Sequence, residues 1–210
     1  MSRRLGVLIS GRGSNLQSII DAIQCGELQA TIAVVISNRP EAAGLLRAKE
    51  AGLETVCLRQ KDFDSRDAYD EAVAEALRAR EVDLVCLAGF MRLVGAQLLE
   101  AFPHKVVNIH PSLLPAFPGL DAPQQALDYG VRVAGATVHL VTAEPDGGPI
   151  VLQAAVPVLP DDTAERLSAR ILIEEHRLYP KAIGVVLDGD WRIEGRRFLV
   201  VAPARGSVST

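Results

Sequence analysis

The sequence predicts a single α/β domain whose mostly parallel, twisted sheet is flanked by helices on both faces. Three observations carry this prediction. The chain has 210 residues, which is enough for one compact domain and short for two. Hydrophobic residues make up 49% of it, so a full core can form. Short apolar runs alternate with amphipathic stretches, a rhythm typical of strand–helix–strand units with buried strands.

The first 110 residues follow this rhythm closely. Apolar runs predict buried strands at Leu5–Ile9, Thr31–Ile36, Thr55–Leu58, Leu84–Ala88 and Lys105–His110. Apolar residues at helical spacing predict helices at Asn15–Cys25, at Pro40–Ala51, and from a cap at Asp64 or Ser65 to about Arg80. A further short helix is expected before Lys105.

After residue 110 the regular alternation of strands and helices gives way to a proline-rich loop, longer strands and one long helix. Prolines at 111, 115 and 118 predict a stiff loop, and a helix is expected at Ala122–Tyr129. Strands are expected at Gly135–Thr142, at Val151–Val158, and in a hairpin of Trp191–Ile193 with Arg197–Val200. A long helix should run from Thr163 to about Leu187, interrupted or bent at Pro180. The domain is expected to cover residues 1–203, with residues 204–210 as a flexible tail.

Composition excludes several classes of protein. The formal net charge of −4 argues against a nucleic-acid or membrane-surface partner. No apolar run approaches the ~20 residues that span a bilayer, and the first run is short for a signal peptide, so a cytoplasmic location is expected. Cys25, Cys57 and Cys86 are predicted to be buried free thiols in a reducing compartment. No cluster at metal-ligand spacing appears, so no metal is expected.

A glycine-rich turn, Gly11-Arg12-Gly13-Ser14-Asn15, follows the first predicted strand and opens the first helix. Backbone N–H groups at a helix N-terminus bind anions, and Ser14 and Asn15 add side-chain donors. The third glycine of a dinucleotide fingerprint is absent, and no acid ends the second strand. The turn therefore suits a single phosphate better than a dinucleotide, although a purely connecting turn has the same composition.

Asn108 and His110 are the most informative pair in the sequence. Residues two apart in a strand share a face, so both side chains point the same way at the end of the fifth predicted strand. Ligands bind at such strand ends in open α/β sheets. An amide N–H and an imidazolium N–H aimed at one point stabilise an oxyanion. A lone histidine at a strand end is more often structural, and the residues alone leave both interpretations open.

Asp146 lies in the tight turn Asp146-Gly147-Gly148-Pro149, between two predicted strands. Asp and Gly favour turns, so the residue types are explained without a function. A carboxylate beside His110 would instead favour the protonated imidazole. No Ser or Cys stands in a nucleophile setting, so a functional site here is predicted to transfer an acyl group directly, without a covalent intermediate.

Five motifs together resemble those of the glycinamide ribonucleotide formyltransferases, folate-dependent enzymes of purine biosynthesis. The similarity runs in order, at family spacing, from about Leu5 to about Leu187. The motifs are the glycine turn, Ala88-Gly89-Phe90-Met91-Arg92, Asn108-Ile109-His110-Pro111-Ser112-Leu113-Leu114-Pro115, Asp146-Gly147-Gly148-Pro149 and Glu174-Glu175-His176. The Asn-x-His-Pro-Ser stretch and the Asp-Gly-Gly turn are shared by the wider folate-dependent formyltransferases, whereas the Gly-Ser-Asn turn and Glu175 are more particular to the ribonucleotide enzymes.

The resemblance implies that 10-formyltetrahydrofolate, as cosubstrate, gives its formyl group to the amine of glycinamide ribonucleotide. It assigns catalysis to Asn108 and His110, which would stabilise a tetrahedral oxyanion, and to Asp146. Asp146 would keep His110 protonated and orient a water that moves a proton from the amine to the folate nitrogen.

The resemblance also assigns the two binding sites. The ribonucleotide phosphate would be held by Gly13, Ser14 and Asn15, and its ribose by Glu175. The folate would contact residues from four parts of the chain: Arg66, Met91, Arg92, Leu93, Val94, Asn108, His139, Val141 and Glu144. The small-molecule substrates would be the partners of a monomer or homodimer.

One departure from the family pattern concerns the proline-rich loop. Family members usually carry histidines in a Pro-Gly-x-His-x-His pattern, whereas here Pro118-Gly119-Leu120 is followed by Asp121-Ala122-Pro123. This difference puts a role for those histidines in doubt and leaves Asn108, His110 and Asp146 untouched.

Two alternatives accompany this interpretation. Another folate enzyme, such as a formyltetrahydrofolate hydrolase or a formyltransferase for an amino-sugar or aminoacyl-tRNA, shares part of the motif set but usually carries a further domain. A non-enzymatic module that binds a phosphoribosyl ligand would explain the glycine turn and leave Asn108, His110 and Asp146 unexplained.

Overall fold

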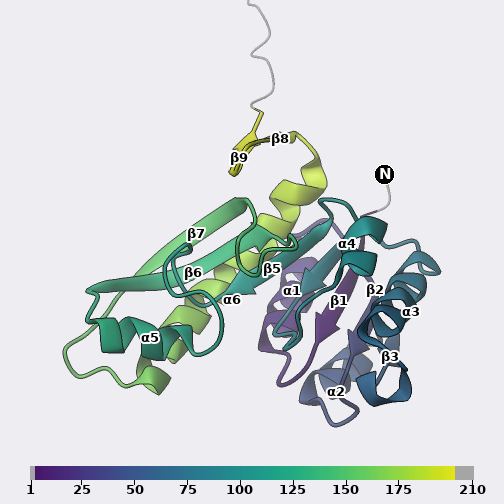
Figure 1. Cartoon of the computed structure of the whole chain (residues 1–210), viewed down its shortest axis with the longest axis horizontal. Helices are drawn as coiled ribbons and strands as arrows, with labels where there is room; N and C mark the ends of the chain where they lie inside the picture. Colours follow the sequence, from purple (N-terminus) through teal and green to yellow (C-terminus); the bar gives the residue numbers. More distant parts are fainter. Residues whose placement is uncertain (1–2, 202–210) are drawn as a thin grey trace, which may run out of the picture.

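The fold is a nine-stranded mixed sheet with helices on both faces, seen in a computed structural model that describes residues 3–201 (Figure 1). The described strands lie in the order β3-β2-β1-β4-β5-β6-β7-β9-β8. Their bounds are β1 Arg4–Ile9, β2 Thr31–Ser37, β3 Thr55–Cys57, β4 Leu84–Leu87, β5 Val106–His110, β6 Val133–Leu140, β7 Ile150–Pro157, β8 Trp191–Glu194 and β9 Arg197–Val200. This confirms the predicted α/β class with a mostly parallel sheet.

Strand direction changes at β5. Strands β1 to β5 pair in parallel, and β5 also pairs with β6 in the antiparallel direction. The β6–β7 pair is antiparallel too. β5 thus has a parallel neighbour on one side and an antiparallel one on the other, and Asn108 lies opposite Leu87 of β4 and His139 of β6.

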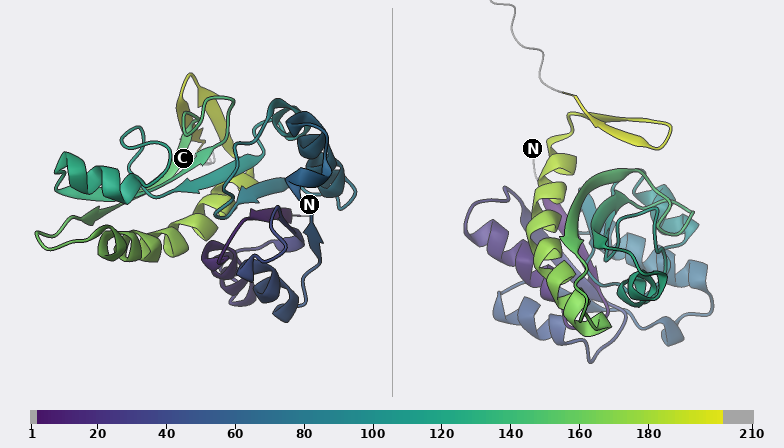
Figure 2. Two further views of the ribbon diagram at one scale, coloured as in Figure 1. Left: turned by 60° about the horizontal axis from the view of Figure 1, so that its bottom comes forward. Right: turned by 90° about the vertical axis from the view of Figure 1, so that its left-hand side faces the viewer.

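Helices cover the sheet in two layers. Their bounds are α1 Ser14–Gln24, α2 Ala43–Glu50, the 3₁₀ turn η1 Gln60–Asp62, α3 Arg66–Arg78, α4 Ala96–Ala101, α5 Ala122–Tyr129 and α6 Ala164–Asp188. Alternate residues of β1 enter opposite cores, because strand side chains point alternately to the two faces. Val7 packs with α1, α2 and α6, whereas Leu8 packs with α3 and α4. Figure 2 shows α1 and α6 on the same face of the sheet.

Most predicted elements agree with the structure to within two residues, and two predictions need correction. The helix expected from Pro40 begins at Ala43, because Pro40 and Glu41 form a turn held by the Ser37 hydroxyl, which bonds both polar backbone atoms of Arg39. Pro180 does not interrupt α6, which runs unbroken through it, so the predicted interruption is wrong and the alternative, a bend, stays a prediction. Burial of Tyr179, Pro180 and Ile183 within the folded domain offsets the lost backbone hydrogen bond.

Tyr179 connects α6 to the middle of the sheet. Its side chain is fully buried, and its hydroxyl is shared between the carbonyl oxygens of Leu87, at 2.9 Å, and Val107, at 3.2 Å. These carbonyls belong to the neighbouring strands β4 and β5. The contact fixes α6 relative to the strand that carries Asn108.

The predicted terminal hairpin is confirmed as β8 and β9, and it joins the main sheet through β7. The prediction of buried thiols holds for Cys86 only. Cys25 follows the end of α1 and Cys57 ends the edge strand β3, so both are exposed. The predicted tail, residues 204–210, lies outside the described residues. Within residues 3–201, every helix is too short or too polar to cross a bilayer.

Candidate active site

The predicted site residues gather where β1, β4 and β5 end, on loops that are bonded to one another. Ser10, the residue after β1, donates its backbone N–H to the Gly89 carbonyl at 3.1 Å. Its hydroxyl accepts the Met91 N–H at 2.8 Å and donates to the Asn38 side chain at 2.7 Å. Sequence reasoning did not single out Ser10, although it directly precedes the glycine turn. It fixes the loop after β4 beside that turn.

The glycine turn is held against α2 by backbone contact. Gly13 has φ of 72°, and a Cβ built on it would lie 2.6 Å from the Gly44 Cα. The Gly44 N–H donates to the Gly11 carbonyl at 3.0 Å, and Arg47 donates to the Arg12 carbonyl at 3.0 Å. Only glycine combines this conformation with this approach. The turn therefore presents the free N–H groups that begin α1 in one fixed direction.

Asn15 and Glu175 connect the turn to α6. The Asn15 amide donates to the Glu175 carboxylate at 2.8 Å, and both side chains are buried. Burial raises the pKa of Glu175, an effect opposed by the Asn15 hydrogen bond and by nearby His110. The Asn15 carbonyl oxygen, Oδ1, is buried without a partner among the described residues. The structure thus brings together these two predicted substrate contacts, 160 positions apart in the sequence.

Asn108 and His110 occupy the end of β5, as predicted from their spacing. Ile109 between them points into the core, and Pro111 ends the strand. His110 is 5% exposed, and its Nε2 lies 2.9 Å from the Phe117 carbonyl oxygen. Its other ring nitrogen, Nδ1, lies 3.6 Å from Oδ2 of Asp146. Because a carbonyl only accepts, Nε2 carries a proton and Nδ1 faces the carboxylate.

Asp146 is close to both buried histidines of the site. Its Oδ1 lies 3.7 Å from His139 Nε2, and its Oδ2 accepts the Gly119 N–H at 2.8 Å. Asp146 has φ of 52°, a left-handed conformation that costs non-glycine residues about 1–3 kcal/mol. Gly148 follows, where any Cβ would collide with the Leu140 carbonyl oxygen. The turn is therefore built to direct a carboxylate toward β5.

The proline-rich loop closes over this edge of the sheet. Phe117 and Asp121 also have positive φ, 53° and 55°, and Gly119 bonds Asp146. Asp121, which stands in the region where the family usually has histidine, is exposed and makes no side-chain cap to α5. Asp146 itself and two residues of this loop, Phe117 and Asp121, are thus strained, as often occurs at functional sites.

The predicted folate contacts form a second group beside the first. Arg66 begins α3 and donates to the Leu93 carbonyl at 2.8 Å, which joins it to the loop of Met91, Arg92, Leu93 and Val94. Met91 and Leu93 are 61% and 59% exposed, so two large apolar side chains of this loop are open to a ligand.

Arg92 is held by Tyr69, a residue that sequence reasoning missed. The guanidinium carbon lies 4.4 Å from the Tyr69 ring centroid, a cation–π contact. Burial raises the pKa of the Tyr69 hydroxyl to about 12. The helical spacing of α3 indicates only that this aromatic residue belongs to the core.

Val141 and Glu144 belong to the segment after β6. Val141 donates its backbone N–H to the Val106 carbonyl at 2.8 Å, which continues the contact between β5 and β6. Glu144 is exposed and pairs with Arg196 of the terminal hairpin at 3.4 Å. The structure therefore places Val141 near β5, whereas Glu144 lies further out, on the surface.

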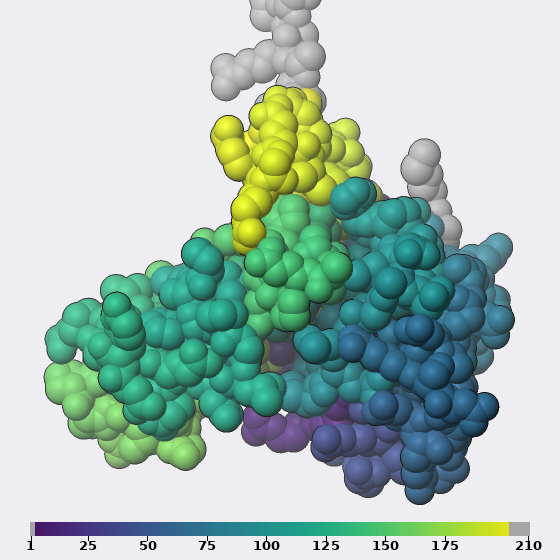
Figure 3. All heavy atoms as spheres, viewed as in Figure 1, coloured from purple at the N-terminus to yellow at the C-terminus, as the bar shows by residue number. Residues whose placement is uncertain are grey.

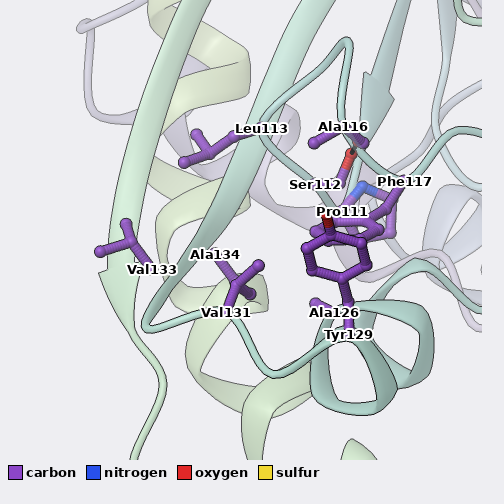
Figure 4. A pocket seen from close by; sticks show the side chains of 10 residues that line it. All are labelled: Pro111, Ser112, Leu113, Ala116, Phe117, Ala126, Tyr129, Val131, Val133 and Ala134. Atoms are coloured by element: carbon purple, nitrogen blue, oxygen red, sulfur yellow. Dashed lines mark hydrogen bonds between the residues drawn. The ribbon is translucent and has the colours of Figure 1, made fainter.

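The molecular surface is hollowed between the proline-rich loop and the α3 side of the sheet, with N-terminal residues visible at its base (Figure 3). A separate apolar pocket of about 420 Å³ opens beside the loop, where the Phe117 and Tyr129 rings lie 5.7 Å apart (Figure 4). None of the predicted catalytic or binding residues lines that pocket. Among residues 3–201, no group of three or more His, Cys, Asp or Glu side chains is arranged to hold a metal ion.

Comparisons with known proteins place the chain in a family. Residues 3–183 match the family described as formyl transferase. The chain is 56% identical to glycinamide ribonucleotide transformylase 1 from Symbiobacterium toebii, whose crystal structure has a TM-score of 0.94 over 96% of this chain and 95% of that one. It is 45% identical to the phosphoribosylglycinamide formyltransferase of Escherichia coli K12, over 87% of this chain and 86% of that protein. The chain belongs to the phosphoribosylglycinamide formyltransferases.

This formyltransferase also resembles one part of larger proteins. It is 46% identical over 189 residues to the trifunctional purine biosynthetic protein adenosine-3 of Drosophila melanogaster. That alignment covers 89% of this chain and 14% of the insect protein. The comparisons confirm the family inferred from the sequence motifs, and the roles of individual residues remain predictions.

Proposed function

We propose that this formyltransferase moves the formyl group of 10-formyltetrahydrofolate to the amine of glycinamide ribonucleotide, a step of purine biosynthesis, by direct attack through a tetrahedral oxyanion. The hydrogen bond between Asn15 and Glu175 is the observation that carries the proposal. It joins an anion-binding turn to a buried carboxylate close to His110, so a phosphoribosyl amine bound there reaches the catalytic strand.

The ribonucleotide would be bound from its phosphate end. Free N–H groups of Ser14 and Asn15 and the positive end of the α1 dipole attract the phosphate. Glu175 would accept hydrogen bonds from the ribose hydroxyls, and the unpartnered Asn15 Oδ1 provides a further acceptor. A buried polar atom without a hydrogen-bond partner costs free energy in the empty site. Such a substrate would supply the missing partner.

The folate would occupy the surface formed by the loop after β4 and the start of α3. Met91, Leu93 and Val94 offer apolar contact, whereas Arg92 and Arg66 offer positive charge for the acidic tail of the cosubstrate. Arg92, fixed over the Tyr69 ring, can donate in one direction without losing side-chain entropy. His139, Val141 and Glu144 would flank the pterin, with Asn108 between the two substrates.

The oxyanion would be stabilised by Asn108 and His110. Because the Phe117 carbonyl holds a proton on Nε2, the neutral His110 ring has only a lone pair at Nδ1. Nδ1 can donate to an oxyanion only when the ring carries its second proton. A carboxylate 3.6 Å away favours that charged form, so Asp146 supports the donor state of His110.

Proton transfer completes the proposed reaction. The substrate amine forms a bond to the formyl carbon, and the carbonyl electron pair moves to oxygen. When the tetrahedral intermediate collapses, the bond from that carbon to the folate nitrogen breaks. Asp146 would orient a water that carries the amine proton to the leaving nitrogen, so charge balances within the site. Amide, imidazolium and carboxylate groups supply these functions, and the proposed mechanism uses no metal.

A formyl-transfer assay with three acceptors tests the proposed function: glycinamide ribonucleotide, water and an amino-sugar. We expect turnover that requires the ribonucleotide. Formate release at the same rate without any amine would contradict the proposal and favour a formyltetrahydrofolate hydrolase. Tight folate binding with no turnover on any acceptor would indicate a binding module. Cytoplasmic location and a monomer or homodimer remain predictions.

A further inference from the structure

We propose that His139 is a positioning residue: its ring sets the orientation of the Asn108 amide, so that an N–H rather than the carbonyl oxygen faces the reacting formyl group. The inference rests on the proposed function only in that it takes Asn108 as an oxyanion donor. It assigns to His139 a role distinct from contact with the pterin.

The strand register brings the two residues together. Asn108 of β5 is paired with His139 of β6 at the point where the sheet becomes antiparallel. The Asn108 Nδ2 atom lies 3.2 Å from His139 Nε2, within hydrogen-bond distance. His139 is 2% exposed and Asn108 is partly buried, so the histidine side of this contact is shielded from solvent. The buried Nε2 atom of His139 therefore has the Asn108 amide as its hydrogen-bond partner.

The second nitrogen of the ring decides which group donates. His139 Nδ1 lies 3.0 Å from the Leu140 carbonyl oxygen, and that oxygen can only accept. The proton of a neutral ring is thus on Nδ1, and Nε2 is an acceptor. Only the NH₂ end of Asn108 can meet such an acceptor, because its oxygen would oppose a lone pair.

The surroundings keep the ring neutral. Burial lowers the pKa of His139, although the Leu140 carbonyl and Asp146 act in the opposite direction, and His110 adds to the lowering. The groups facing the ring are Asp146, 3.7 Å from Nε2, and His110 on the neighbouring strand. A charged His110 beside it, as the proposed mechanism requires, makes a second positive charge at His139 unfavourable.

The consequence is a fixed donor. One N–H of Asn108 is bonded to His139, and the other is left for the developing oxyanion. Without an acceptor at the Nε2 position, the amide can turn by 180° and present its oxygen, which would repel the oxyanion. An N–H donor stabilises a developing oxyanion most when it already points at the oxyanion position before the reaction.

Two substitutions separate this role from packing. His139→Leu removes the acceptor and keeps an apolar side chain in the core. His139→Gln places an amide oxygen near the position of Nε2, where it accepts from Asn108. We expect kcat to fall about tenfold in H139L and to return to within about threefold of the original enzyme in H139Q. The Kd for the folate should change by a smaller factor than kcat in H139L, although His139 also flanks the pterin in the proposed function.

The matched control is Val138→Ala, which removes buried volume from the same strand on its opposite face. V138A should lower stability and leave kcat unchanged. Thermal unfolding of every variant reports whether a lower rate reflects loss of folded protein.

A double-mutant cycle with Asn108→Ala decides between the possible outcomes. If His139 acts through Asn108, H139L lowers kcat no further in the N108A enzyme. Additive losses, a low kcat in H139Q equal to that of H139L, or a folate Kd that rises by as large a factor as kcat falls would overturn the positioning role. A normal kcat in N108A alone would instead overturn the oxyanion role of Asn108 in the proposed function.

Discussion

The glycine turn and the end of β5 with the loops around it, called here the β5 edge, are built differently: backbone contacts shape the first and side chains the second. The turn lies in the parallel part of the sheet, and its shape comes from backbone atoms: Gly13 against Gly44, and carbonyls of Gly11 and Arg12 bonded to α2. The β5 edge lies where the sheet turns antiparallel. It depends on side chains, and strained loops hold them in place. Binding of the ribonucleotide should therefore be sensitive to a Cβ added at Gly13, where the turn meets α2, and chemistry should be sensitive to the loss of particular functional groups.

The largest effect is expected at the β5 edge. His110→Ala and Asp146→Asn should each lower kcat at least about a hundredfold, because each removes transition-state stabilisation of roughly 2.7–4 kcal/mol. Stability should change little, since neither group supports the core clusters. Steady-state kinetics and thermal unfolding of the purified variants measure both effects. Near-normal turnover in either variant would remove that residue from the mechanism.

The next effect concerns the turn. Gly13→Ala should raise the KM for the ribonucleotide at least about tenfold and lower the free energy of unfolding by about 1–3 kcal/mol, because a left-handed alanine is strained and its Cβ meets α2. Gly11→Ala is the matched control, since a Cβ there meets nothing within 4 Å. Equal effects in the two variants would show that the contact with Gly44 does not shape the turn.

Glu175→Gln tests the link between the two regions. The KM for the ribonucleotide should rise about tenfold, because a charged acceptor for the ribose becomes neutral. Denaturant unfolding at several pH values gives a second test, because the free energy of unfolding should depend on pH through Glu175. Since the folded pKa of Glu175 is raised by burial, its contribution to stability is full below the unfolded pKa and is lost as pH rises through the raised one. Gln does not titrate, so E175Q does not lose stability in this way as pH rises. The free energy of unfolding of E175Q relative to that of the original protein should therefore increase with pH. A constant difference across pH would mean that Glu175 does not titrate as a buried carboxyl.

The smallest effect is expected at the surface, where Arg196 and Glu144 are both about two-thirds exposed. Arg196→Ala should change Tm by less than about 2 °C and the folate KM by less than about twofold, because exposed ion pairs contribute little. A severalfold rise in that KM would show that the terminal hairpin positions the segment that flanks the pterin.

The sequence predicts those features that depend on local spacing. Asn108 and His110 share a face because they are two residues apart, and Ser65, one of the two proposed caps, bonds the Ala68 N–H as α3 begins. The contacts of Ser10, Gly44 and Tyr69 could not be predicted, because each partner lies in a distant segment. The exposure of Cys57 depends on β3 being an edge strand, a property of strand order rather than of the apolar run. The continuity of α6 through Pro180 likewise depends on tertiary packing.

Tyr179 fixes the position of α6 relative to the strands that carry the site, and this has a consequence for the choice of acceptor. Tyr179 and Glu175 are four residues apart and so lie on one face of the helix. The Tyr179 hydroxyl is shared between two strands, next to the peptide unit of Asn108. The distance from Glu175, the proposed ribose contact, to Asn108 and His110, the proposed oxyanion donors, is thus set inside the protein and not by its loops. Adapting the site to a longer or shorter acceptor would require α6 to slide along the sheet, which this buried hydroxyl opposes. Changes in acceptor length are therefore harder to evolve than changes in the folate surface, where exposed side chains can be replaced one at a time.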